Sequence, residues 1–454
     1  MFINRRNFIG IIGLSSLICA SGYNYKVVNY NSTQINIKEF GAKGDGFSDD
    51  TLALLSALQH LKDIAGGTIC IPSGRYVISD VVKFGVFSYF KDIKILGEGD
   101  SSIFVLCKGS MSFGGFSNFT IQDMKFVRDV LTTNNERNKY QINMSNFDGL
   151  TIDNVTFDEF GPTDTVFPIP GSTILFFYAG AKTGSVTSPD IIPGDSSNFK
   201  LLNSRFLAGG DRTVNFGVRI YTEFVADEIE TMKGGVVRNC IFDGFNWNAV
   251  EIAGPQTKYI DVNNCKVISG GLTGIEVDKG ASYCSITQCE FFNLSGNVDV
   301  SLYPNTAISG VVLQGDSPGN LVGKMNRIED VNVYLTYTAF KYPNRIHGIS
   351  IVDVEFCVVK GVKVVISQSL ETDVIGESVS IFISGKYKGN IIEDCFLSGF
   401  QHGIDVKSTK SDCDEQALFN IKNVVFSKRL NSSTLFYGGY DACNIMTENA
   451  QFTL

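Results

Sequence analysis

Three acidic residues on two short segments are the strongest candidates for chemistry in this 454-residue sequence. Glu251 lies in the segment Val-Glu-Ile-Ala-Gly, and Glu276 and Asp278 lie in the segment Ile-Glu-Val-Asp-Lys. In both segments apolar and polar residues alternate, which is typical of a strand with one buried face. Glycoside hydrolysis needs one protonated and one ionised carboxyl group. We therefore take Glu251, Glu276 and Asp278 as the candidate catalytic residues, and a solvated outer sheet face as the alternative.

The two acidic segments follow similar phrases at the same distance. Glu251 comes twelve residues after Asn239, and Glu276 comes twelve residues after Asn264. If these phrases are equivalent turns of a coil, the two glutamates lie on adjacent strands about 4.8 Å apart. Asp278 is then diagonal to Glu251, roughly 7 Å away. Neighbouring carboxylates disfavour each other's ionisation, so one of them is expected to have a raised pKa.

Other residues of this region are candidate substrate contacts. Alternation places side chains of the preceding strand on the same outer face, and it places Asp299 there one coil later. Trp247, the only tryptophan, either stacks on a sugar ring or packs in the core. The predicted substrate-binding residues are Asp211, Arg212, Arg219, Tyr221, Trp247 and Lys279.

A six-residue phrase recurs along the chain and predicts how these strands are positioned. It has apolar first and last residues and a polar third residue. Steps of 25 and 24 residues separate positions 239, 264 and 288, and a step of 23 separates 330 and 353. A period in the low twenties with β character is typical of a parallel β-helix. The third position is held by Asn154, Asn203, Asn239, Asn264, Gln288, Asp330, Asp353, Asp394 and Asn423.

Two ladders are expected from this repeat. Asn or Asp at one register suits a tight bend with a left-handed backbone conformation. The next register holds Cys240, Cys265, Cys289 and Cys395, which we expect to stack in the core as thiols rather than as disulfides. Residues 158–196 and 303–324 interrupt the repeat with Pro and Gly, and we expect such elaborations to wall a binding groove.

The segment from residue 35 to 80 resembles a known signature. It reads Phe-Gly-Ala-Lys-Gly-Asp-Gly, then Asp-Asp-Thr, a helical stretch over 52–64, Gly-Gly, and Pro-x-Gly-x-Tyr. This is similar to the N-terminal signature of the pectate-lyase-like (rhamnogalacturonase/epimerase-like) β-helix superfamily. The resemblance implies a right-handed, single-stranded, all-β parallel helix whose short N-terminal helix caps the stack. The acids Asp45, Asp49 and Asp50 are interpreted as turn and helix-cap residues, with a calcium site as the alternative.

The resemblance also bears on the reaction. Polygalacturonase-type hydrolases of this fold carry clustered carboxylates on the outer sheet and invert configuration, which implies Glu251 working with Asp278, supported by Glu276. Their Asn-Thr-Asp, Gly-His-Gly and Arg-Ile-Lys motifs do not occur here. A lyase of this fold needs a base, for which Arg219 and Lys279 are the candidates.

The N-terminus reads as an export signal. Arg5-Arg6 precedes an apolar run over 9–20, which is short for a membrane span, and an uncleaved anchor is the alternative. We expect a signal over 1–22, a linker over 23–34 and one domain over 35–454. Its caps are expected over 35–80 and 408–454, because an open end would expose sheet edges.

Composition narrows the partners. The net charge is -9 and no basic stripe is visible, so nucleic acid is not expected. Eleven cysteines without a CxxC pair and only 3 histidines do not predict a zinc site, and we expect no cofactor. The sequence leaves the oligomeric state open.

Three functions follow from these features. The first is an exported glycoside hydrolase that cleaves an acidic or capsular polysaccharide. The second is a polysaccharide lyase acting by β-elimination on a uronate polymer, and the third is a non-catalytic polysaccharide-binding or assembly protein. The combination of export signal, cap and coil also resembles β-helix proteins of colanic-acid clusters in enteric bacteria, which implies an exopolysaccharide context outside the cytoplasm.

Overall fold

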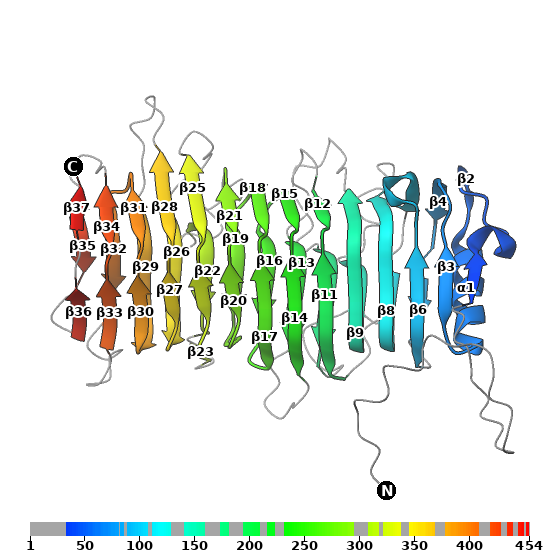
Figure 1. Cartoon of the computed structure of the whole chain (residues 1–454), viewed down its shortest axis with the longest axis horizontal. Helices are drawn as coiled ribbons and strands as arrows, with labels where there is room; N and C mark the ends of the chain where they lie inside the picture. The colour runs from blue at the N-terminus through cyan, green and yellow to red at the C-terminus, as the bar shows by residue number, and fades with distance from the viewer. Residues whose placement is uncertain are drawn as a thin grey trace, which may run out of the picture.

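The chain forms a long column of β-strands, with the N-terminal end on the right of Figure 1 and the C-terminal end on the left. In this computed structural model, residues 1–32 lie outside the described part of the chain, and with them the predicted signal and nearly all of the predicted linker. The structure describes residues 33–80, 82–85, 89–107, 111–128, 140–158, 173–180, 194–208, 216–222, 231–294, 307–316, 321–336, 345–367, 377–407, 418–427, 434–438, 444–448 and 451–453.

The strands form three parallel sheets, and most coils contribute one strand to each. Sheet 1 contains β5 (Val82–Phe84), β10 (Thr173–Ala179), β13 (Phe216–Thr222), β16 (Asn248–Ala253), β19 (Thr273–Asp278), β22 (Ile308–Gln314), β26 (Arg345–Glu355), β29 (Glu377–Lys388), β32 (His402–Lys407) and β35 (Thr434–Gly438). The long strands β8 (Met111–Arg128) and β9 (Tyr140–Asp158) run through all three sheets.

Sheets 2 and 3 complete each coil. Sheet 2 contains β1 (Gln34–Asn36), β3 (Gly67–Cys70), β6 (Phe90–Leu96), β11 (Ser196–Leu202), β14 (Met232–Arg238), β17 (Thr257–Asn263), β20 (Ser285–Thr287), β24 (Arg327–Glu329), β27 (Val358–Lys360), β30 (Asn390–Glu393), β33 (Leu418–Lys422) and β36 (Asn444–Glu448), and the short β23 (Gly323–Lys324) pairs with the end of β26. Sheet 3 contains β2 (Asp45–Asp49), β4 (Gly74–Ile78), β7 (Ser102–Leu106), β12 (Arg205–Leu207), β15 (Ile241–Phe245), β18 (Lys266–Gly270), β21 (Glu290–Phe292), β25 (Asn332–Thr336), β28 (Lys363–Ser367), β31 (Phe396–Ser398), β34 (Val425–Ser427) and β37 (Gln451–Thr453).

The predicted parallel β-helix is confirmed, because each strand pairs in parallel with its counterpart one coil away. Apolar side chains that alternate along these strands fill the interior, as the period of two requires. The rings of Phe157, Phe206 and Phe242 stack on successive coils, with centroids 4.7 and 4.9 Å apart. The four predicted core cysteines are buried free thiols.

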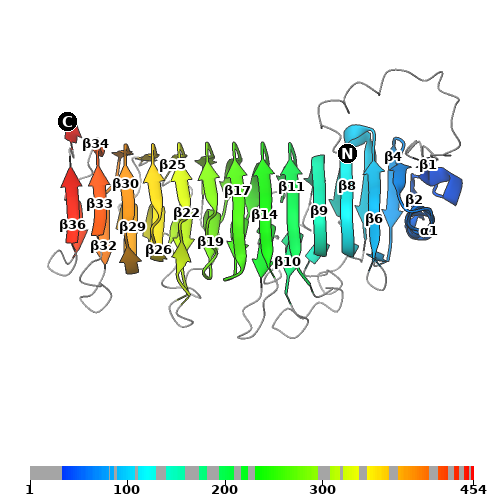
Figure 2. The same ribbon diagram turned by 60° about the horizontal axis from the view of Figure 1, so that its bottom comes forward.

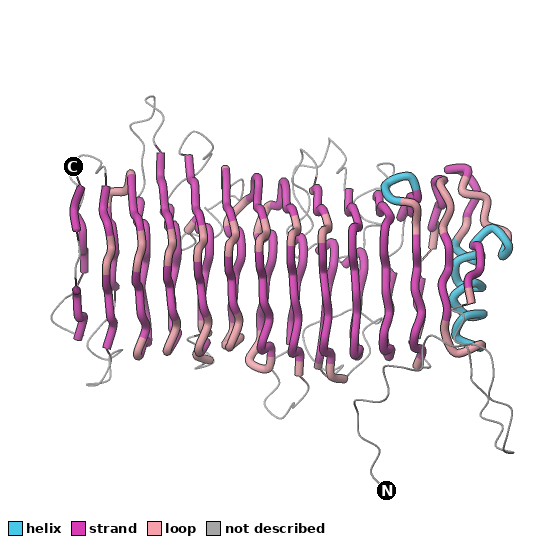
Figure 3. Tube along the Cα trace, viewed as in Figure 1, coloured by secondary structure: helices cyan, strands magenta, loops and turns pink. Residues whose placement is uncertain are grey.

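One short helix lies at the N-terminal end of the column. Helix α1 (Thr51–Asp63) is one residue offset from the predicted 52–64 and buries Leu54, Leu58 and Leu61 against the first coils. Figure 2 shows it end-on beyond β6, and Figure 3 shows it as the longest cyan segment, at the right-hand end of the column. Two short 3-10 turns, η2 (Ile37–Phe40) and η3 (Gly99–Ser101), accompany the cap. Within the part of the chain that the structure describes, no helix has the length and apolar character needed to cross a membrane.

The three acids of the cap serve the backbone. The carboxylate of Asp45 accepts the N–H groups of Phe47 and Ser48, and that of Asp50 accepts the N–H groups of Lys43 and Gly44. Asp49 accepts the N–H of Thr51 at the start of α1. These bonds are the turn and helix-start interactions that the sequence predicted.

The polar ladder is confirmed at most positions and wrong at one. Asn239, Asn264 and Gln288 occupy the left-handed region at the bend from sheet 2 to sheet 3, with φ between 51° and 56°. On the coil after Asp330, however, Gly361 holds this bend. The evidence is that the N–H of Asp330 donates to the carbonyl of Lys360, the residue before Gly361. Asp353 lies instead at the end of the sheet 1 part of β26. The 23-residue step from Asp330 to Asp353 therefore joined residues at two different bends of the coil.

The two predicted interruptions each contain a strand of sheet 1. β10 lies within 158–196 and β22 lies within 303–324, so the coil continues through both segments. Most of the Pro and Gly residues in these two segments lie outside the described residues.

Replacing Asn239 with alanine is expected to destabilise the protein by about 1–2 kcal/mol. The substitution places a Cβ without a compensating side chain at φ 56°. It also removes bonds to Asn203 and Asn264, of 3.0 and 2.9 Å. Asn239→Gly loses the same hydrogen bonds, but glycine adopts the left-handed backbone conformation without strain. Its thermal midpoint should therefore lie above that of the alanine variant. Equal midpoints for the two variants would show that the backbone conformation contributes nothing.

Candidate active site

The outer face of sheet 1 brings the three predicted catalytic residues together. Glu251 of β16 pairs in register with Glu276 of β19, so the predicted adjacency is confirmed. Ala253 pairs with Asp278 and, on the other side, with Tyr221 of β13. The result is a row of acidic, basic and aromatic side chains crossing three successive strands.

Glu251 is held by an ion pair. Its carboxylate accepts a hydrogen bond from Nε of Arg219, which lies opposite it on β13. Glu251 is only 5% exposed, so this pair is largely removed from water. The guanidinium of Arg219 also lies 4.4 Å from the ring centroid of Phe216 and 5.5 Å from that of Tyr221. Arg219 therefore neutralises a buried carboxylate within an aromatic surround.

Glu276 is the carboxyl group with the most perturbed acidity. Burial and, after it, the neighbouring charges of Asp278 and Glu251 together raise the pKa of Glu276 to about 8. The amide Nδ2 of Asn248 donates to its Oε2 at 2.5 Å, which partly offsets the shift. Glu276 thus carries a proton at neutral pH.

Asp278 lies at the edge of the row. Burial raises the pKa of Asp278 to about 6, while the charge of Lys279 opposes the shift. Its Oδ1 accepts the backbone N–H of Lys279 at 2.6 Å. The ammonium of Lys279 lies 5.2 Å from the ring centroid of Tyr221, across the small side chain of Ala253.

The remaining predicted contacts divide into two groups. Arg219, Tyr221 and Lys279 lie beside the acids, whereas Trp247 stacks on Phe216, with centroids 6.0 Å apart, and packs against the core. Asp211 and Arg212 lie outside the described residues. The expectation that Asp299 follows Glu276 on the next coil is wrong, because Val312 of β22 pairs with Glu276.

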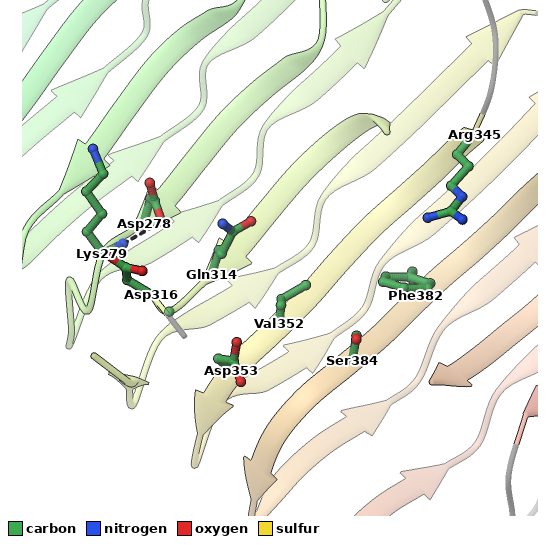
Figure 4. Close-up of a pocket in the computed structure, with 10 residues that line it drawn as sticks. Asp278, Lys279, Gln314, Asp316, Arg345, Val352, Asp353, Phe382 and Ser384 are labelled. Atoms are coloured by element: carbon green, nitrogen blue, oxygen red, sulfur yellow. Dashed lines mark hydrogen bonds between the residues drawn. The ribbon is translucent and has the colours of Figure 1, made fainter. Parts of the chain in front are cut away.

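An open groove of about 480 Å³ continues from this row toward the C-terminal coils. Asp278 and Lys279 line one end of it, and Arg345 and Phe382 line the other, as Figure 4 shows. Asp353, which the repeat had misplaced, also lines this groove. An elongated depression across several coils suits an extended polymer better than a compact ligand.

Sequence reasoning missed Asn248 and the groove residues of β22, β26 and β29. Asn248 lies three residues before Glu251, so a simple alternation puts it on the inner face. The register shows that residue 249 is skipped between the pairs at 248 and 250. This bend returns Asn248 to the outer face, where it contacts Glu276. No signal in the sequence marks the bend except the Gly or Ala at this register, as at Gly217 and Gly274.

The acidity of Glu276 predicts how stability depends on pH. Its folded-state pKa of about 8 lies above its ordinary value of 4.5. Between these values the folded state binds more protons than the unfolded state, so stability falls as pH rises through this window. The thermal midpoint is expected to drop by roughly 1–3 °C between pH 5 and pH 8. Glu276→Gln should flatten this dependence; an unchanged slope in that variant would contradict the assigned acidity.

Comparison with known families gives a match over the first half of the coil. The sequence model of the family described as "Rhamnogalacturonase A/epimerase, pectate lyase-like" matches residues 34–299, more than half of the 454-residue chain. The matched region includes α1, the sheet 1 strands β13, β16 and β19, and the acidic row.

Individual relatives match over shorter segments. Over 68 residues, 14% of this chain, the sequence is 40% identical to alginate lyase 7 of Azotobacter vinelandii. Over 66 residues, also 14% of this chain, it is 38% identical to the mannuronan C5-epimerase AlgE1 of the same organism. The matched segments span 8% and 5% of these relatives, so most of each relative has no counterpart in the match.

A solved structure agrees over nearly the whole length. The A-module of the Azotobacter vinelandii mannuronan C-5 epimerase AlgE4 superposes with a TM-score of 0.51 and 13% sequence identity. The superposition covers 93% of this chain and 98% of that module. At 13% identity this likeness establishes a shared fold. The reaction has to be inferred from the residues of the site.

Proposed function

This chain belongs to the rhamnogalacturonase A/epimerase, pectate lyase-like family, and from that premise we propose that it modifies a uronate polysaccharide by removing the proton at C5. Removal of this proton leads either to β-elimination, in which the C4–O4 bond breaks and an unsaturated sugar forms, or to epimerisation, in which a proton returns on the opposite face. The names of the partial relatives, an alginate lyase and a mannuronan C5-epimerase, support this substrate class.

The observation that carries the proposal is the neutral carboxyl group of Glu276. The C5 proton of a uronate is weakly acidic because the neighbouring carboxylate is already negative. A protonated acid that donates a hydrogen bond to that carboxylate stabilises the charge that develops when the proton leaves. Glu276, whose pKa burial and the neighbouring acids raise to about 8, supplies such a donor at neutral pH.

Tyr221 is the proposed proton-transferring group. Two cations lie near its ring, with the guanidinium of Arg219 at 5.5 Å and the ammonium of Lys279 at 5.2 Å from its centroid. Positive charges close to the ring favour negative charge on the phenol oxygen as the tyrosine exchanges its proton with the substrate. Lys279 also lies where it attracts an anionic substrate into the groove.

Arg219, which the sequence offered as a base, takes a different proposed role. A guanidinium does not lose its proton in proteins. Its hydrogen bond to Glu251 and its contact with Phe216 fix it beside Tyr221. We assign Arg219 and Glu251 to positioning the row and to balancing its charge.

A glycoside hydrolase remains the second candidate, for one reason. Glu276 and Asp278 have pKa values raised to about 8 and about 6, so near pH 7 the first is protonated and the second is ionised. That division of protonation states is what an acid and a base require in hydrolysis. This pairing replaces the expected pair of Glu251 and Asp278, because the carboxylate of Glu251 is engaged by Arg219.

The variant Glu276→Gln separates the two reactions by its pH profile. If Glu276 only donates a hydrogen bond, glutamine substitutes for it, and activity at pH 7 should stay within about tenfold of wild type. Wild-type activity should fall above pH 8 as Glu276 ionises, whereas the variant should keep its activity there. If Glu276 is the proton donor of a hydrolase, the variant should lose about 10²–10⁴-fold at every pH.

The reaction itself is tested by incubating the purified protein with polymannuronate, polyguluronate and polygalacturonate in deuterated water. Deuterium at C5 without chain cleavage indicates an epimerase, and the absorbance of an unsaturated uronate indicates a lyase. New reducing ends without that absorbance indicate the hydrolase. Binding without any chemical change would overturn the enzymatic proposal in favour of a binding or assembly protein. The twin-arginine start supports a further proposal, that this reaction takes place outside the cytoplasm.

A further inference from the structure

A second ladder of residues runs along a bend near the start of sheet 2. On four successive coils Tyr259, Tyr283, Met325 and Phe356 hold equivalent positions. The backbone N–H of each donates to the carbonyl of the residue preceding its counterpart on the next coil. All four have φ between 56° and 59°, in the left-handed region. The ladder therefore places four large apolar side chains where the backbone conformation opposes them.

The earlier coils show what this bend otherwise uses. At the same register the chain has Asp92, Asn118, Gly149, Asn198 and Gly234. Those residue types accept a left-handed backbone readily. Tyr259 follows Gly234 directly on this ladder, since the register pairs Lys233 with Lys258 and Gly235 with Ile260. The change to large apolar residues spans these four consecutive coils, and Gly389 holds the position on the coil after Phe356.

The four side chains are also exposed. Their exposed fractions are 57%, 44%, 47% and 40% in chain order. The rings of Tyr259 and Tyr283 lie 5.2 Å apart at 31°. A strained backbone that presents solvent-exposed apolar side chains contributes nothing to the core. Strained, exposed apolar positions of this kind are typical of binding sites.

We propose that this apolar stripe, consisting of Tyr259, Tyr283, Met325 and Phe356, binds a single chain of acidic polysaccharide lying along the helix axis, as a surface separate from the catalytic row. The substrate class rests on the proposed function, whereas the binding itself does not depend on catalysis.

The shape of the stripe favours one extended chain over a second protein. It is one residue wide, and adjacent coils rise by about 4.8 Å, which is close to the length of one sugar residue. Its exposed side-chain area is roughly 400 Å², about half of the 800 Å² per partner that a stable protein interface buries. The apolar C–H faces of pyranose rings pack on aromatic side chains of this kind.

The charges beside the stripe favour an acidic polymer. The residues that precede the ladder positions include Lys258 and Lys324, and Lys388 holds this position on the coil after Phe356. Glu355 is the one acid in that row and pairs with Lys324 at 3.1 Å. Three lysines against one glutamate form a local positive excess on a chain whose net charge is -9.

The test replaces the stripe by the residue type that the earlier coils use. In the full chain, the variant Tyr259→Asn/Tyr283→Asn/Met325→Asn/Phe356→Asn should fold with a thermal midpoint no lower than wild type, because Asn accepts the left-handed backbone. In affinity electrophoresis through gels containing polygalacturonate or polymannuronate, its dissociation constant should rise at least tenfold. The control Ile268→Asn removes an equally exposed apolar side chain from sheet 3 and should leave binding unchanged.

Each contrary result is decisive. Wild-type affinity in the fourfold variant, or wild-type protein that binds neutral dextran as tightly as the polyuronates or binds neither polyuronate, overturns the stripe proposal. So does a wild-type dimer in sedimentation that dissociates in the variant, since the occupant is then a second copy. Stripe-dependent binding without any turnover would refute the proposed reaction and leave the stripe standing. Turnover of polyuronate together with equal affinity in the wild type and the fourfold variant would support the proposed reaction and refute the stripe proposal.

Discussion

Replacing Tyr221 with phenylalanine is expected to lower kcat on a uronate polymer by about 10²–10⁴-fold, the usual contribution of a positioned acid or base. The change removes one oxygen atom and keeps the ring. The ring contacts with Tyr178, at 6.3 Å between centroids, and with Lys279 should therefore persist. KM should change little, because the phenol is assigned to proton transfer and not to binding. Initial rates of C5 deuterium exchange and of chain cleavage measure the effect.

Two further variants make this result specific. Tyr89→Phe makes the same chemical change on an exposed tyrosine near the N-terminal end of the column and should leave kcat unaltered. Lys279→Met should raise KM for the acidic polymer and lower kcat less than Tyr221→Phe does. If Lys279→Met instead abolishes turnover while Tyr221→Phe keeps it, the amine is the proton acceptor and the assignment of Tyr221 is wrong.

Replacing Arg219 with methionine is expected to destabilise the protein by about 3–5 kcal/mol. Glu251 is 5% exposed, and Arg219 is the cation that accompanies its carboxylate. Removing the guanidinium leaves a buried negative charge whose desolvation is no longer offset. The loss of the contact with Phe216 adds to the effect. Thermal denaturation of both proteins at pH 7 measures the difference.

The double variant Arg219→Met/Glu251→Gln isolates the charge from the packing. With the carboxylate replaced by a neutral amide, most of the lost stability should return, and the coupling between the two positions should be at least 1.5 kcal/mol. The exposed pair of Lys266 and Glu290, with side chains 45% and 40% exposed, is the matched control. Its disruption by Lys266→Met should cost less than about 1 kcal/mol. A double variant as unstable as Arg219→Met alone would show that packing and not charge dominates.

The sequence was sufficient for the coil and for the neighbourhood of the acids. Each coil requires a left-handed bend, and few residue types accept that conformation, so Asn239, Asn264 and Gln288 mark it in the sequence. Between two such marks the chain length is nearly constant. Equal offsets from Asn239 and Asn264 therefore placed Glu251 against Glu276, as the register has it.

The repeat failed where its marker changed type or its connections lengthened. Gly361 takes the bend that Asp353 was expected to hold, because glycine adopts the left-handed conformation as well as Asn does. The chain between β19 and β22 includes residues 295–306, which do not follow the period of the repeat. Counting by the period therefore placed Asp299 beside Glu276, whereas Val312 is the residue that pairs with Glu276 on the next coil. The groove residues Arg345 and Phe382 lie beyond this break.

Only the tertiary structure decided what the acids are suited to do. Alternation shows which side chains point outward, but protonation depends on burial and on partners from other coils. The sequence does not show that Arg219 engages Glu251, that Asn248 contacts Glu276, or that the surrounding coils remove Glu276 from water. Bends recur because they are local requirements of the backbone, whereas acidity is set first by burial under the surrounding coils and then by charges and partners that include Asn248, 28 positions from Glu276 in the sequence.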